Sequence, residues 1–152
     1  MNNTKAISSN LVVIFGNNKI SNGEFLRLKE VQTQPKIGFK LEPNKIYTFV
    51  IVDPDTPKGY HIHQCTYNLS INSKIKPVQY YIYAPPSPPP GTGPNKDGKH
   101  RYYCIMYEQD GKIEGRKEML GRAFEDYDDF KKLLGVPLKA VSYKYFVCKN
   151  GN

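Results

Sequence analysis

The chain contains no tryptophan, only three cysteines and no apolar run long enough to cross a membrane. Cys65, Cys104 and Cys148 form no C-x-x-C pair, and each lies in an apolar or aromatic stretch. That setting favours reduced, buried thiols in a cytoplasmic protein over a metal or redox site. Residues 1–10 are polar and lack the apolar segment of a secretory signal, so we expect a cytoplasmic location.

Signatures of catalysis are missing as well. The sequence has no G-x-S-x-G nucleophile elbow and no phosphate-binding P-loop, so serine-nucleophile chemistry and P-loop nucleotide binding have no support. We expect a binding module with no catalytic residue, no metal and no cofactor. A hydrolase or metal-dependent enzyme that uses the His and Asp residues described below is the alternative.

What is present is a composition of ordinary globular type. The 152 residues are 39% hydrophobic and 24% charged, which predicts a single domain over residues 1–152. The net charge of +8 favours anionic partners, namely phosphate groups, a peripheral anionic membrane surface or nucleic acid. Lysine and arginine are spread along the chain, so no specific nucleic-acid partner is expected, and non-specific nucleic-acid binding is a further alternative.

Short strands dominate the predicted secondary structure. β-Branched and aromatic runs, separated by Asn, Gly and Pro turn signals, predict strands over 11–15, 46–52, 61–69, 77–83 and 102–107. Residues 46–52 are apolar on both faces, so this strand should be covered on both sides.

One late helix is predicted over residues 122–134. Phe124, Tyr127 and Leu134 follow helical spacing, acidic residues fill the first half, and Gly135 supplies the stop. Many strands with one late helix indicate a mostly antiparallel β-sandwich.

Two strand ends and one loop collect the polar residues that can carry chemistry. His61 and His63 are two residues apart on one strand, so their imidazoles should be neighbours on one face. Asp53 and Asp55 lie in D-P-D-T-P, where the preceding strand ends, and His100 lies at the entrance of a later strand. The proline-rich segment 83–93 lies between two strands, which predicts a rigid surface loop.

These residues allow three interpretations. D-P-D-T-P is most often a turn, with its aspartates capping nearby amides. H-x-H with Asp53 or Asp55 is compatible with zinc, although no residue is available to support the ligands. The imidazoles, the Arg101 guanidinium and the Gly91-Thr92-Gly93 amides together suit a phosphate group.

The ordered motifs resemble the phosphatidylethanolamine-binding protein family. The resemblance covers roughly residues 40–150 and lies in motifs that follow in the family's order: D-P-D-T-P at 53–57, His61-Ile62-His63 leading to Asn68, Y-A-P-P-S-P-P-P-G-T-G at 83–93, K-H-R-Y at 99–102, Tyr107-Glu108-Gln109, Val136-Pro137-Leu138 and Ala140-Val141.

The resemblance implies a Greek-key β-sandwich with a small anion pocket that accepts phosphate-like groups, including a phosphorylethanolamine headgroup. It further implies a protein partner such as a kinase or a protease. The ligand-binding residues that it implies are Asp53, Pro57, His63, Ser87, His100 and Tyr102. The supporting residues are Asp55, His61, Gly91, Gly93 and Arg101.

Three departures from the family pattern bear on this pocket. Residues 94–98 are an insertion between G-T-G and H-R, and His61 stands where an aromatic residue is usual. The chain ends at Asn152, where some members continue into a helix that covers the pocket. We therefore expect a more open site with different lipid selectivity.

The charges suggest a binding mechanism. A phosphate beside a carboxylate is unfavourable unless a proton intervenes, so we expect Asp53 to hydrogen-bond one imidazole and favour its charged form. The imidazolium would then face the phosphate, and binding should weaken as the pH rises through about 7. Strand alternation turns Arg101 away from His100, which indicates a structural or surface charge.

Overall fold

Two sheets and one helix make up the fold. The computed structural model describes residues 10–115 and 117–150, so the prediction for residues 1–10 falls almost entirely outside the described residues. The larger sheet is built in the order β3 (Glu24–Phe25), β10 (Leu138–Lys149), β8 (Lys99–Gln109), β5 (Ile46–Thr56), β6 (Gly59–Leu69) and β7 (Val78–Tyr81), with β9 (Ala123–Phe124) paired to β6. The smaller sheet has the order β2 (Asn18–Lys19), β1 (Val12–Phe15) and β4 (Lys36–Gly38). A short 3₁₀ helix, η2 (Leu28–Val31), and α1 (Tyr127–Leu133) complete the elements.

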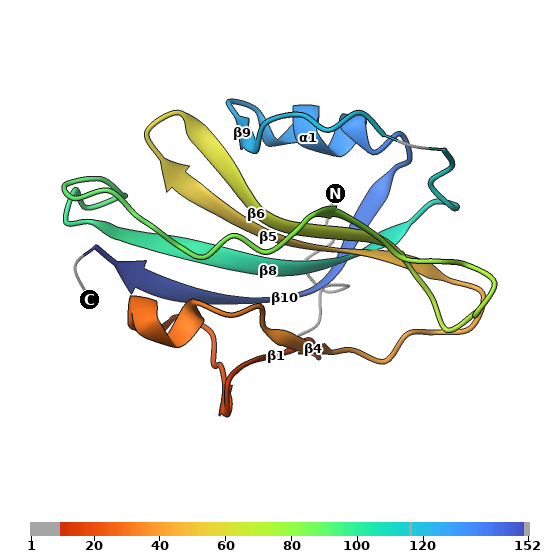
Figure 1. Ribbon diagram of the computed structural model, residues 1–152, viewed down its shortest axis with the longest axis horizontal. Coiled ribbons are helices and arrows are strands. Elements are labelled where there is room, and N and C mark those ends of the chain that lie inside the picture. Colours follow the sequence, from red (N-terminus) through yellow and green to blue (C-terminus); the bar gives the residue numbers. More distant parts are fainter. Residues whose placement is uncertain (1–9, 116, 151–152) are drawn as a thin grey trace.

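The larger sheet is the middle layer of the molecule. On one face, Phe49, Ile51 and Phe146 pack against Val13 and Phe15 of β1. On the other face, Val50, Val52 and Ile62 pack against Phe130 and Leu134 from the α1 region. In Figure 1, α1 and β9 lie beyond β6, whereas β1 and β4 lie beyond β10. The prediction that strand 46–52 is covered on both sides is confirmed, since residues 47–52 are buried from both faces.

The predicted antiparallel Greek-key sandwich is confirmed. Strands β5, β6 and β7 are joined as successive antiparallel neighbours, and β8 returns through the proline-rich segment to lie beside β5. This order of four strands defines a Greek key. The two-residue pairing of β3 with β10 is parallel and departs from the antiparallel pattern.

All five predicted strands exist, but the predicted helix is too long. Strand β8 begins three residues before the predicted start, because its pairing with β10 continues to Lys99. Residues 122–126 are not helical: Ala123 and Phe124 form β9 on the edge of β6, and Asp126 caps α1 by accepting a hydrogen bond from the Asp128 amide. Side-chain periodicity cannot reveal this pairing, since it depends on a strand some 60 residues away.

No helix among the described residues is long and apolar enough to span a membrane. The three cysteines are free and buried, as predicted.

Candidate functional site

A cavity of about 240 Å³ opens where the ends of β5 and β6 and the start of β8 meet the proline-rich loop. It contains five of the six predicted ligand-binding residues, namely Asp53, Pro57, His63, Ser87 and Tyr102, and the predicted supporting residue His61. The remaining lining residues are Thr56, Pro85, Pro88 and Pro89. These four were missed by the sequence interpretation, although they lie within the two motifs that drew attention to the site.

His100, the predicted second pocket imidazole, does not line the cavity and lies directly behind it. The ring is fully buried behind Asp53, with Nδ1 2.6 Å from Asp53 Oδ2. Its Nε2 lies 2.6 Å from the Thr92 hydroxyl, which itself donates to the Pro89 carbonyl. Both ring nitrogens therefore have protein partners, and His100 supports Asp53 rather than the ligand.

This hydrogen-bond chain determines where the protons lie. The Pro89 carbonyl only accepts, so the Thr92 hydroxyl gives its proton to that carbonyl and must accept from His100 Nε2. The remaining proton lies between His100 Nδ1 and Asp53, so the pair is neutral overall. Burial raises the pKa of Asp53 despite the hydrogen bonds from His100 and the Asp55 amide, and this direction is consistent with a shared proton.

His63 presents its ring to the cavity because strand β6 contains a β-bulge at this position. Ile51 pairs with Gln64 and Val52 pairs with Ile62, so His63 is the extra residue and lies on the cavity side, next to the Tyr102 ring. His63 Nδ1 donates to the Ala84 carbonyl at 2.7 Å, which leaves Nε2 for a ligand.

The predicted hydrogen bond between Asp53 and one imidazole is present, but the surroundings of His63 disfavour a positive charge on the imidazole that lines the cavity. Burial lowers the pKa of His63 to about 4, and the hydrogen bond to Ala84 opposes this only in part. The imidazole that contacts Asp53 is His100, which does not face the cavity. Near neutral pH, therefore, His63 Nε2 offers a lone pair instead of the expected positive charge.

His61 and His63 are neighbours, as predicted from their spacing. Their ring centroids are 4.7 Å apart, and His61 lies at the half-buried edge of the cavity. Burial and the nearby Arg122 lower the pKa of His61 as well. Two neutral imidazoles therefore line one wall.

Tyr102 supplies the unpaired group of the site. The residue is fully buried, and its hydroxyl has no hydrogen-bond partner among the described residues. Its ring stacks on Phe146 with centroids 5.2 Å apart, which holds it in place at the cavity. Burial, together with the nearby Asp53, keeps the pKa of Tyr102 far above its usual value, so the hydroxyl is a donor that has Asp53 close by but not in hydrogen-bonding geometry. A buried hydroxyl without a partner is destabilising unless a ligand satisfies it.

The predicted supporting residues divide into two groups. Asp55 braces the site, since both carboxylate oxygens contact the Arg101 guanidinium while its own amide donates to Asp53. Arg101 points away from His100, as predicted. Gly91 and Gly93 lie outside the lining, so the structure does not place their amides at the cavity wall. Gly93 instead allows the loop to approach β8, because a Cβ there would lie 2.1 Å from the Lys99 carbonyl oxygen.

Arg122 was missed by the sequence interpretation. Its guanidinium donates to the carbonyl oxygens of Ile62, His63 and Ile82 and lies over the Tyr81 ring. It thereby holds the β6 bulge that aims His63 at the cavity. Its contacts are to backbone oxygens, so no sequence pattern points to them.

Two further residues of the family motifs, Asn68 and Gln109, have a structural role away from the cavity. Asn68 and Gln109 hydrogen-bond each other at the far ends of β6 and β8, and Thr48 and Ile113 complete this buried network. Within residues 10–115 and 117–150, no group of three or more His, Cys, Asp or Glu side chains is arranged to hold a metal ion.

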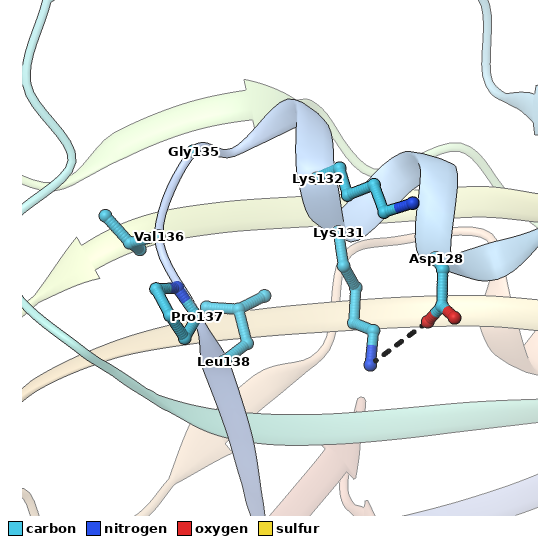
Figure 2. A pocket seen from close by; sticks show the side chains of 7 residues that line it. All are labelled: Asp128, Lys131, Lys132, Gly135, Val136, Pro137 and Leu138. Carbon is cyan, nitrogen blue, oxygen red and sulfur yellow. Dashed lines mark ion pairs between the residues drawn. The ribbon is translucent and has the colours of Figure 1, made fainter.

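A second hollow, of about 480 Å³, lies at the C-terminal end of α1 (Figure 2). Lys131 and Lys132 line it together with the apolar wall Val136–Leu138, and Lys131 contacts Asp128 at 3.5 Å. None of the predicted site residues lies here.

Comparison with known proteins agrees with the motifs. The model of the phosphatidylethanolamine-binding protein family matches residues 15–142. A 26 kDa secreted antigen of Toxocara canis is 30% identical over 117 residues, a match that covers 72% of this chain and 43% of the antigen. Protein FLOWERING LOCUS T of Arabidopsis thaliana is 28% identical over 149 residues, covering 90% of this chain and 79% of the plant protein. The chain thus spans less than half of the antigen and most of the plant relative.

Two solved structures share the fold. Carboxypeptidase Y inhibitor, in complex with its cognate proteinase, superposes with a TM-score of 0.66 at 18% identity, covering 92% of this chain and 82% of the inhibitor. A Chlamydia trachomatis protein described as a homologue of the same family gives a TM-score of 0.58 at 23% identity, covering 92% and 97% of the two chains.

Proposed function

The chain belongs to the phosphatidylethanolamine-binding protein family, and we propose that it binds a phosphate-bearing small molecule or lipid headgroup in the cavity between Asp53, His63 and Tyr102. The observation that carries this proposal is the buried Tyr102 hydroxyl without a partner. A phosphate oxygen is a strong acceptor for this donor. The neutral Asp53–His100 pair removes the repulsion that a free carboxylate would exert on the anion.

The proton arrangement favours a phosphate that carries one proton. A phosphomonoester monoanion accepts from Tyr102 through one oxygen and donates its own hydroxyl to His63 Nε2. Its second pKa is about 6, so above this pH the complex holds a proton that the separate partners lack. Affinity should then fall up to about tenfold for each pH unit between roughly 6.5 and 8. This direction agrees with the sequence prediction, but the proton now lies between the phosphate and His63.

The test compares two ligands by calorimetry from pH 5.5 to 8. O-phosphorylethanolamine, a monoester, should bind progressively more weakly across this range. Glycerophosphorylethanolamine, a diester that does not titrate there, should show little change. Tyr102→Phe should weaken both ligands by roughly fivefold to tenfold, since one hydrogen bond is lost. Failure of both ligands to bind the wild-type chain would refute the proposal.

Binding without catalysis is part of the proposal. The pair Asp53–His100 leads to the Thr92 hydroxyl, but this hydroxyl donates its proton to the Pro89 carbonyl, so His100 is not placed to withdraw that proton and activate a nucleophile. Incubation with a phosphomonoester and a carboxylic ester should release no product. A cytoplasmic location, inferred from three reduced cysteines, is likewise proposed and is tested by fractionation.

Regulation of another protein is the second proposal. Carboxypeptidase Y inhibitor, which shares the fold, was solved with its proteinase, and this favours a protease as a partner over a kinase. Affinity capture with the wild-type chain and with Tyr102→Phe would decide whether the ligand site matters. Partners that are lost with the variant would indicate ligand-dependent regulation, whereas partners that are retained would indicate recognition elsewhere. An anionic membrane surface is tested in parallel with vesicles in a salt series.

A further inference from the structure

A second surface of aromatic residues lies on the larger sheet, on the face that α1 covers over β5, β6 and the Tyr107 end of β8. Here Tyr103 of β8 pairs with Tyr145 of β10, and Tyr143 lies one step further along β10. The Tyr103 and Tyr145 rings stack with centroids 5.0 Å apart and planes at 17°, and Tyr143 lies 6.0 Å from Tyr103. Three phenol rings therefore form a continuous row across two strands.

Phe25 and three basic residues border this row. Phe25 of β3 pairs with Val147, on the same face of the sheet. Lys99 and Lys149 pair across β8 and β10, and the Arg101 guanidinium lies 5.8 Å from the centroid of the Tyr103 ring. We use the term tyrosine face for the surface formed by Phe25, Lys99, Arg101, Tyr103, Tyr143, Tyr145 and Lys149.

The tyrosine face is open to solvent. Phe25 is 45% exposed and Tyr143 is 36% exposed, while Tyr103 and Tyr145 are half-buried. Exposed aromatic rings grouped on one face mark a binding surface more often than isolated ones do. The buried tyrosines, such as Tyr47 and Tyr67, lie in the two cores and cannot serve in this way.

The charge on this surface is positive. Lys99 and Lys149 border a hollow of about 490 Å³, together with Gly23, Phe25 and Val147. The Arg101 side chain is 44% exposed, whereas the carboxylate of its partner Asp55 is only 4% exposed and lies beneath it. A ligand therefore meets cations beside flat rings, on a chain whose net charge is +8.

We propose that the tyrosine face binds single-stranded nucleic acid, with bases stacked on the exposed rings of Phe25 and Tyr143, beside the stacked pair Tyr103–Tyr145, and with phosphates beside Lys99 and Lys149. A sheet that presents aromatic rings between basic side chains suits unpaired bases, because every base has a stacking face and every link has a phosphate. Protein interfaces, by contrast, are depleted in lysine. Recognition by stacking is tolerant of sequence, so the absence of a dense basic motif does not oppose it.

The first experiment separates stacking from charge. Fluorescence anisotropy is measured with a short labelled oligodeoxythymidylate and with an abasic strand of the same length and charge. We expect the abasic strand to bind at least about tenfold more weakly, since each stacked base contributes measurably. Equal affinity for the two strands, or no binding of either, would overturn the proposal and leave the face to a protein partner.

The second experiment tests the rings with matched variants. Tyr103→Leu/Tyr143→Leu keeps apolar side chains but removes the flat rings, and affinity for the oligonucleotide should fall about tenfold. Tyr103→Phe/Tyr143→Phe retains both rings and should bind as the wild type does. Circular dichroism and thermal unfolding establish that both variants fold. Equal affinity of the two double variants would contradict a stacking role.

The third experiment tests the cations. Lys99→Gln/Lys149→Gln should reduce the slope of log affinity against log salt by roughly 0.7 for each lysine. The control is Lys74→Gln/Lys76→Gln, which changes the net charge equally in the exposed loop before β7, at the opposite edge of the sheet. A reduction of the same size in the control would show that only net charge matters and would overturn the proposed site. Binding of O-phosphorylethanolamine, measured on the same variants, should not change, so the two sites are tested independently.

Discussion

Strand β8 supplies side chains to two surfaces that differ in nearly every physical respect. Tyr102 lines the cavity and His100 lies behind it on the same face of the strand, whereas Lys99, Arg101 and Tyr103 belong to the tyrosine face. Alternation along one strand separates the two sets. On the cavity side the polar atoms are buried and joined by short hydrogen bonds. On the tyrosine face the groups are held by ring stacking and by the ion pair between the exposed Arg101 guanidinium and the Asp55 carboxylate beneath it.

This difference predicts how each surface responds to substitution. Buried polar groups depend on one another, because removing one partner leaves the other without compensation. Exposed rings and lysines have solvent as an alternative partner, so their loss changes binding far more than folding. Substitutions at the cavity should therefore alter the free energy of unfolding, while substitutions on the tyrosine face should leave it nearly constant.

The largest effect is expected for His100→Ala. The variant leaves Asp53 buried without the imidazole that shares its proton, and loss of one partner of a buried pair lowers the free energy of unfolding by about 3–5 kcal/mol. The neighbouring Lys99→Ala, on the tyrosine face, should change it by less than about 0.5 kcal/mol. Urea denaturation of both variants measures the contrast. A loss below about 1 kcal/mol for His100→Ala would show that the cavity is no more interdependent than the open face.

The burial of His63 should make the free energy of unfolding depend on pH. Burial lowers its pKa to about 4 in the folded chain, whereas the unfolded value is near 6.5. Between these two values the unfolded chain binds a proton that the folded chain excludes, so stability falls as the pH falls through this window. From pH 7 to 4 the wild type should lose about 3 kcal/mol more than His63→Gln does.

Thermal or urea unfolding of the two proteins at several pH values measures this difference. Asp53 and His61 are present in both the wild type and His63→Gln, so their contributions to the pH dependence of stability cancel in the difference between the two proteins. Parallel curves for wild type and variant would show that the His63 ring accepts a proton without leaving its buried position.

The sequence predicted those features of the site that depend on the spacing of residues along one strand. Neighbouring imidazoles at His61 and His63 follow from the two-residue repeat of a strand, and the outward turn of Arg101 follows from alternation. The role of His100 could not be predicted in this way. Alternation places its side chain on the cavity side of the strand, but it does not show how deeply the ring is buried. Its burial depends on Gly93, whose missing Cβ lets the proline-rich loop close over the ring.

The strands of the fold also differ in how well the sequence predicts them. Strand β5 was recognisable from its run of apolar residues, since a strand buried on both faces needs no partner to be identified. The short strands β2, β3, β4 and β9 were not predicted, because two or three residues carry too little periodicity, and the long strand β10 was not among the predicted strands either. Their pairing is imposed by tertiary contacts, and β9 even lies in a segment whose spacing suggests a helix.

Tyr102→Phe should show opposite effects on stability and on ligand binding. The variant removes a buried hydroxyl that has no partner in the described structure, so the free energy of unfolding should rise by about 1 kcal/mol. Ligand affinity should fall at the same time, as described above. Tyr103→Phe, on the tyrosine face, should leave both quantities unchanged, and thermal unfolding with and without O-phosphorylethanolamine measures both. A destabilised Tyr102→Phe would show that the hydroxyl is already satisfied in the folded chain.

The smallest effect is expected for Arg101→Ala, which tests whether the two surfaces are truly separate. Burial alone would raise the pKa of Asp55, and the hydrogen bonds from Arg101 outweigh burial, so the pKa lies below its usual value. Because the Arg101 side chain is 44% exposed, its removal opens Asp55 to water, so the free energy of unfolding should fall by only about 1 kcal/mol or less. Asp55 keeps the Arg101 backbone amide as a donor, and its own amide continues to donate to Asp53. The cavity should therefore bind O-phosphorylethanolamine within about twofold of the wild type, as measured by calorimetry. A tenfold loss would mean that the ion pair positions Asp53, and that β8 transmits changes on its open face to the buried site.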